Sequence, residues 1–179
     1  MRIIAGKYKK TPLKTIESDS TRPTKDMVKE ALFDSIQIMP DEKLLDLFAG
    51  SGAIGIEAIS RGAKAEFNDL NREAIKVIEA NLDKIHEEAK VLNLNYDECL
   101  AKQKDGKFDY LFVDPPYAFE QYDNIFVLAN KYNVMNDKGL IILEVKADRS
   151  FKEEYEDYKL FKEKKYGICK LLYYRRSKQ

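Results

Sequence analysis

The chain has 179 residues, 44% of them apolar, which suits one domain with a substantial core. Its 31 basic residues balance 31 acidic ones, so it is not a polycation that would bind nucleic acid over its whole surface. One histidine, His86, and two distant cysteines, Cys99 and Cys169, argue against most metal centres and catalytic triads. We see neither a membrane-spanning stretch nor a signal peptide and expect a cytoplasmic protein.

Positive charge is concentrated at the N-terminal end. Residues 1–29 hold eight basic and three acidic side chains, a net charge of +5, so the rest of the chain carries −5. Two strand-like segments, residues 2–5 and 13–16, flank a turn and predict a β-hairpin. We therefore expect residues 1–20 to form a basic extension and residues 21–179 to form the main domain. A Lys-rich hairpin can also be an ordinary solvated sheet edge, and composition leaves that alternative open.

The first predicted helix begins at Thr24, a residue type that caps helices well. Val28, Leu32 and Ile36 then recur at helical spacing, and the helix ends near Pro40. No internal repeat, low-complexity tract or linker divides the chain.

Beyond Pro40, short apolar runs alternate with helical stretches. The predicted strands are residues 44–48, 65–68, 91–94, 110–113 and 140–145. The predicted helices between them are residues 54–61, 74–85 and 122–129. Continuous apolar strands separated by helices predict a mostly parallel sheet covered on both faces, the doubly wound α/β class. Two further runs, residues 160–166 and 168–175, meet at Gly167 without a helix, so an antiparallel C-terminal hairpin completes the predicted seven-stranded sheet.

In such sheets ligands bind beyond the carboxyl ends of the strands, so the residues that follow each strand are informative. After the first strand, Gly50, Gly52 and Gly55 match GxGxxG, which fits NAD, FAD or S-adenosylmethionine (SAM). A plain tight turn is the alternative. Asp69 ends the second strand and can accept two hydrogen bonds from a ribose diol, although it could instead only cap the next helix. These residues predict a nucleoside cofactor and leave its identity open.

The fourth strand ends in Asp114-Pro115-Pro116-Tyr117, which favours methylation of an exocyclic amino group on a base. The lone pair of such a nitrogen is delocalised into the ring, and acceptors that hold its N–H groups make it a better nucleophile. Asp114 and the Pro115 carbonyl can be those acceptors, while Tyr117 stacks on the base. A Pro-rich turn that packs a tyrosine is the structural alternative. Methylation at a ring carbon usually needs a cysteine nucleophile, and neither cysteine lies at a comparable strand end.

With these motifs the chain resembles the RsmD family of 16S rRNA (guanine-N2)-methyltransferases, over essentially its whole length. The motifs that carry the resemblance are residues 1–7, 21–24 (Thr-Arg-Pro-Thr), 28–33, 46–52, 55–58, 60–63, 114–117 and 165–167. The resemblance implies a class I SAM-dependent, Rossmann-like fold and methylation of a guanine N2 amino group in 16S rRNA. It also implies SAM as cofactor, S-adenosylhomocysteine (SAH) as product, no metal, and 16S rRNA or the assembling small subunit as partner. We expect a monomer.

The resemblance also assigns roles to residues. The implied catalytic residues are Asp114, Pro115, Pro116 and Tyr117. The implied cofactor-binding residues are Asp46, Phe48, Gly50, Gly52, Asp69, Asn95 and Thr24. The implied RNA contacts are Arg2, Lys7, Lys9, Lys10, Lys14 and Arg22. Asn95 stands where family members usually have an aspartate that holds the adenine amino group; its carbonyl can accept the same bond, and Asp97 is the alternative.

Three other functions are compatible with parts of the sequence. A DNA adenine-N6 methyltransferase would use the same Asp-Pro-Pro-Tyr geometry on a flipped base, but such enzymes usually carry a sizeable target-recognition insertion that has no counterpart here. An RNA-binding module with an inactive cofactor fold is disfavoured by Asp114. An NAD-linked oxidoreductase would have no use for the Asp-Pro-Pro-Tyr motif.

Overall fold

A single mixed sheet runs through the computed structural model, which describes residues 1–16 and 22–177, with the backbone alone for 22–24. Its strands are β1 Lys43–Asp46, β2 Lys64–Asn68, β3 Val91–Leu92, β4 Phe108–Val113, β5 Met135–Lys146, β6 Glu154–Tyr155, β7 Tyr158–Tyr166 and β8 Cys169–Arg176. Their order is β3-β2-β1-β4-β5-β8-β7-β6. Strands β1 to β5 pair with one another in parallel. The pairs β5–β8, β8–β7 and β7–β6 are antiparallel. The strand order reverses between β1 and β4, which is where such sheets bind ligands.

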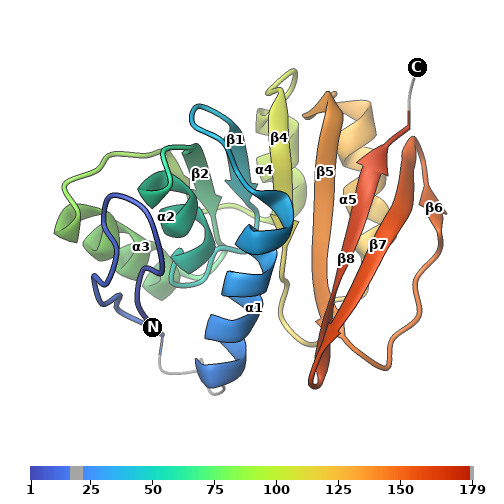
Figure 1. Cartoon of the computed structure of the whole chain (residues 1–179). Helices are drawn as coiled ribbons and strands as arrows, with labels where there is room; N and C mark the ends of the chain where they lie inside the picture. Colours follow the sequence, from blue (N-terminus) through green and yellow to red (C-terminus); the bar gives the residue numbers. More distant parts are fainter. Residues whose placement is uncertain (17–21, 178–179) are drawn as a thin grey trace.

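Five helices cover the two faces of the sheet (Figure 1). They are α1 Arg22–Ile36, α2 Ala53–Ser60, α3 Arg72–Lys84, α4 Tyr96–Lys102 and α5 Tyr122–Lys131. Apolar residues of α1, α2 and α3 pack on one face, and those of α4 and α5 pack on the other. Strands buried from both sides must be apolar throughout, which explains the continuous apolar runs in the sequence. Among the described residues, no helix is long and apolar enough to cross a membrane.

The predicted doubly wound fold with its antiparallel C-terminal hairpin is confirmed, with local differences. The described sheet has eight strands instead of seven, because the two-residue β6 pairs with β7 at the edge. The strand expected over 91–94 is only two residues long, and β5 begins five residues earlier than expected. The short helix α4 was not predicted, since its polar sequence carries no clear apolar stripe.

The N-terminal arm, residues 1–16, reverses direction but does not form the two expected strands. One antiparallel bridge joins Arg2 to Pro12. The amides of Ile4 and Ala5 donate instead to the carboxylate of Glu57 on α2, at 2.9 and 3.0 Å, so they are unavailable to a second strand. The arm is thus held by α2, beside which it lies in Figure 1.

Candidate active site at the carboxyl ends of the parallel strands

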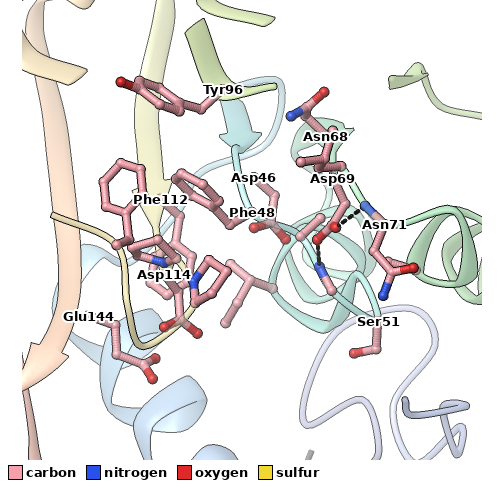
Figure 2. A pocket seen from close by; sticks show the side chains of 18 of the residues that line it. Asp46, Phe48, Ser51, Asn68, Asp69, Asn71, Tyr96, Phe112, Asp114 and Glu144 are labelled. Carbon is pink, nitrogen blue, oxygen red and sulfur yellow. Dashed lines mark hydrogen bonds between the residues drawn. The ribbon is translucent and has the colours of Figure 1, made fainter. Parts of the chain in front are cut away.

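A cavity of about 730 Å³ opens at the carboxyl ends of β1, β2, β4 and β5 (Figure 2). Met1 and Ile16 of the arm and Lys25 and Lys29 of α1 contribute to its wall. The predicted site residues that line it are Asp46, Phe48, Gly50, Asp69, Asn95, Asp114, Pro115 and Pro116. Motifs that lie far apart in the sequence therefore share one cavity.

Each of the three positions of the GxGxxG motif is occupied by glycine for a different structural reason. At Gly50, with a φ of 56°, a Cβ would meet nothing within 4 Å, so the backbone there faces open space in the cavity wall. Gly52 has a φ of 81° and precedes α2, a conformation that favours glycine. At Gly55 a Cβ would lie 2.3 Å from the Phe67 ring, so this glycine is required by close packing of α2 on β2.

Asp69 connects the end of β2 to the glycine loop. Its Oδ2 accepts a hydrogen bond from the Gly50 amide, and its Oδ1 accepts one from the Asn71 amide, each at 2.8 Å (Figure 2). The cap of α3 is supplied separately by Asn71, whose Oδ1 accepts from the Glu73 amide at 2.9 Å. Each carboxylate oxygen of Asp69 retains further acceptor capacity toward the cavity.

Asp46 is buried at the end of β1 beneath the glycine loop. Its Oδ2 accepts a hydrogen bond from the Gly55 amide at 3.2 Å. Burial raises the pKa of this carboxyl to about 7, and the nearby charges of Asp114 and Asp69 act in the same direction. A group that carries positive charge would relieve this clustering of carboxylates.

The Asp-Pro-Pro-Tyr motif divides between the cavity and its exterior. Asp114, Pro115 and Pro116 line the cavity, whereas Tyr117 is 77% exposed and is not among the described lining residues. The Nζ of Lys146 lies 3.6 Å from the centre of the Tyr117 ring. The ring is therefore available to a base only at the entrance, with one face near a lysine.

Aromatic side chains form the wall opposite Asp114. Phe48, Tyr96 and Phe119 contact one another with ring centres 5.2 to 6.1 Å apart. Asn95 lines the cavity beside them, while Asp97 is not among the described lining residues. Sequence reasoning missed Tyr96 and Phe119, whose spacing along the chain gives no sign that they meet.

Sequence reasoning also missed Glu144, on β5. Its side chain lines the cavity and lies near Asp114 in Figure 2. The available signal was one charged residue inside the apolar run 140–145. Burial raises the pKa of the Glu144 carboxyl to about 8, and the charge of Asp114 adds to that rise.

The predicted RNA contacts of the arm lie outside the cavity wall. Arg2, Lys7, Lys9, Lys10 and Lys14 are all exposed. The side chains of Arg22 and Thr24 lie outside the described residues.

Comparison with known proteins identifies the family. The family described as Conserved hypothetical protein 95 matches residues 1–175. "Ribosomal RNA small subunit methyltransferase D" of Haemophilus influenzae is 35% identical over 94% of this chain and 90% of its own length. The Escherichia coli K12 protein of the same name is 32% identical over 100% of this chain and 91% of its own.

The chain belongs to the RsmD family. The solved structure described as "Putative methyltransferase yhhF from Escherichia coli" superimposes with a TM-score of 0.88 at 32% identity, covering 100% of this chain and 99% of that one. A Thermus thermophilus structure gives a TM-score of 0.81 at 27% identity, over 97% and 98% of the two chains. The predicted resemblance to the RsmD family is therefore confirmed over essentially the whole length of this chain.

Proposed function

We propose that this RsmD-family protein is a methyltransferase that transfers the methyl group of SAM to the N2 amino group of a guanine in 16S rRNA. The observation that carries the proposal is the meeting of two motifs in one cavity. Asp69 and the glycine loop form one end of it, and Asp114, Pro115 and Pro116 form the other. A donor site and an amine-holding site then lie close enough for direct transfer.

The cavity suits SAM in three places. The acceptor capacity of Asp69 fits the ribose hydroxyls, and the open backbone at Gly50 leaves room for the methionyl part. The aromatic wall of Phe48, Tyr96 and Phe119 suits the adenine ring, with Asn95 at its edge. The solved structure of SMU.776 has the same fold at 13% identity and a TM-score of 0.67 and is a complex with SAH. This supports SAM as the ligand of the present cavity.

The protein contributes orientation and hydrogen-bond acceptors to the reaction. SAM supplies an electrophilic methyl group on a positively charged sulfur. The carboxylate of Asp114 and the carbonyl of Pro115 accept the two N2 hydrogens, which favours a localised lone pair on nitrogen. As that lone pair forms the N–C bond, the C–S bond breaks toward sulfur, and Asp114 is placed to receive the proton released by nitrogen. Tyr117, exposed at the entrance, is suited to stack on the incoming base.

The remaining expectations concern the partner. The arm contributes Met1 and Ile16 to the cavity wall and carries exposed lysines, of which Lys7 lies at the C-terminal end of α2, where its amide donates to the Ser60 carbonyl. These lysines suit contact with rRNA phosphates. We assign this role to residues 1–20, as an extension of a methyltransferase domain at 21–179. The enzyme would act as a monomer in the cytoplasm, on 16S rRNA or on the assembling small subunit.

A methyl-transfer assay tests the proposal. Purified protein and labelled SAM are incubated with small-subunit particles, with free 16S rRNA or with duplex DNA, and the methylated nucleosides are identified by mass. We expect N2-methylguanosine on RNA and no product on DNA. Asp114→Ala should lower the rate about a hundredfold or more and leave SAM affinity within a few-fold, because Asp114 acts mainly in the transition state. N6-methyladenine on DNA would overturn the assignment in favour of the DNA enzyme.

A further inference from the structure

Glu144 and Asp114 occupy matching positions on neighbouring strands. β4 and β5 are parallel and pair Val113 with Leu143, so the next residues in register are Asp114 and Glu144. Val113 and Leu143 pack in the core on the α4–α5 face, so the following side chains project to the opposite face, toward α1. The two backbones therefore lie about one strand spacing apart at these residues, roughly 4.8 Å, and both side chains project to the same face. Figure 2 shows them near one another at the cavity wall.

The groups around Glu144 include carboxyl groups as well as a lysine. The charged and titratable groups nearest to it are Asp114 on β4, Asp46 on β1, Lys25 on α1 and Cys169 on β8. Two of these four are carboxyl groups. Burial raises the pKa of Glu144, and the charges of Asp114 and Asp46 add to that rise while Lys25 opposes it, so the ionised form lacks full stabilisation by the protein. A ligand that brings an N–H donor would supply that stabilisation.

Guanine presents such a donor next to the amine that is methylated. Its Watson–Crick edge carries N1–H beside the N2 amino group, so two neighbouring acceptors can hold N1 and N2 together. Adenine has an unprotonated N1 beside its amine, and an ionised carboxylate would face a lone pair there. The ionised form of Glu144, which guanine N1–H would stabilise, therefore distinguishes the two bases.

We infer that Glu144 is the residue that selects guanine, by accepting a hydrogen bond from N1–H while Asp114 holds the N2 amino group. This inference rests on the proposed function, since it requires guanine N2 as the target. The bond would be charge-assisted, and it would orient the base so that N2 faces the methyl donor. Asp114 then takes part in the reaction, and Glu144 on the neighbouring strand determines which base is bound.

The test combines a base analogue with a variant. Once the methylated guanosine is mapped, an RNA fragment is made with guanosine at that position, and a second with 2-aminopurine nucleoside. This analogue keeps the C2 amino group but lacks N1–H and the C6 oxygen. Methyl-transfer rates on both fragments are measured for the wild type and for Glu144→Gln, with Glu154→Gln on the edge strand β6 as a matched control.

We expect the wild type to favour guanosine by about tenfold to hundredfold, and Glu144→Gln to reduce that preference at least about fivefold. The loss of the C6 oxygen affects both enzymes alike, so the change in preference isolates N1–H. Glu154→Gln should keep the wild-type preference. SAM affinity of Glu144→Gln should stay within about threefold of the wild type.

Three results would overturn the inference. One is a wild-type enzyme that methylates both fragments equally, a result that does not depend on whether the variant folds. Another is an unchanged preference in Glu144→Gln, and the third is a larger loss of SAM affinity, which would assign Glu144 to the cofactor. A wild type that methylates guanosine neither in the fragment nor in free 16S rRNA nor in small-subunit particles would instead refute the proposed function.

Discussion

Asp69 contributes to SAM binding in two ways, and one substitution removes both. It holds the glycine loop through the Gly50 amide and offers its remaining acceptor capacity to the cavity. Asp69→Ala removes both, so we predict that the dissociation constant for SAM rises at least about tenfold, the effect of losing one or two charge-assisted hydrogen bonds. Calorimetric titration measures this, with the exposed Asp137→Ala as the control. Equal affinity in the two variants would refute the ribose assignment.

Asp46 makes the stability of the ligand-free protein depend on pH. Its carboxyl has an ordinary pKa of 3.8 and a folded-state pKa of about 7, so between these values the folded state holds a proton that the unfolded state has lost. Stability should therefore fall as pH rises from about 4 to about 7, by on the order of a few kcal/mol. Asp46→Asn should reduce that fall, to which Glu144 with its raised pKa also contributes, and should weaken SAM binding. Thermal unfolding at several pH values checks this, and a parallel pH dependence in wild type and variant would contradict it.

At the scale of elements, Glu57 joins three parts of the chain. Besides the amides of the arm, its buried carboxylate contacts Lys29 Nζ of α1 at 3.2 Å and the Nε of Arg61, the residue that follows α2, at 3.0 Å. Lys29 also donates to the Arg2 carbonyl at 2.8 Å. Burial lowers the pKa of Lys29, and Glu57 opposes that effect. This network fixes the arm and α1 against α2, on the side of the cavity.

We predict that Glu57→Gln lowers stability by about 3–5 kcal/mol, because it leaves the buried Lys29 without its counter-charge. Hydrogen exchange at the amides of Ile4 and Ala5 should speed up as well. Thermal unfolding and exchange measurements test this against Glu73→Gln, which removes an exposed pair with Lys76 and should change stability by less than about 1 kcal/mol. Similar behaviour of the two variants would mean that the arm is held by its apolar contacts.

The elements differ in how far the sequence alone could predict them. The strands near Leu44 and Leu111 are buried on both faces, and their continuous apolar runs can be recognised from the sequence alone. The contact that holds Ile4 and Ala5 of the arm depends on Glu57, 52 residues away from Ala5, which no local pattern reveals. Asp69 and Asp114 could be found because a strand ends at each of them. Glu144 could not, because its role depends on the register between β4 and β5.

At the scale of the whole molecule, charge separation points to the RNA-binding side. Residues 1–29 carry a net charge of +5 and the remainder carries −5, and the arm, which borders the cavity through Met1, has exposed lysines. Replacing Lys7, Lys9 and Lys10 with Ala should lower the log–log salt slope of rRNA-fragment binding by about two to three, since each phosphate contact releases counterions. SAM affinity should not change. Equal slopes would identify the arm as a solvated edge.

The central claim, that the molecule methylates guanine N2 in 16S rRNA, is tested most directly in cells. Nucleosides of 16S rRNA are analysed by mass in a strain without the gene, and in the same strain supplied with the wild type or with Asp114→Ala. The account predicts that one N2-methylguanosine is missing without the gene, is restored by the wild type and stays missing with Asp114→Ala. An unchanged set of modified guanosines in the strain without the gene would contradict it.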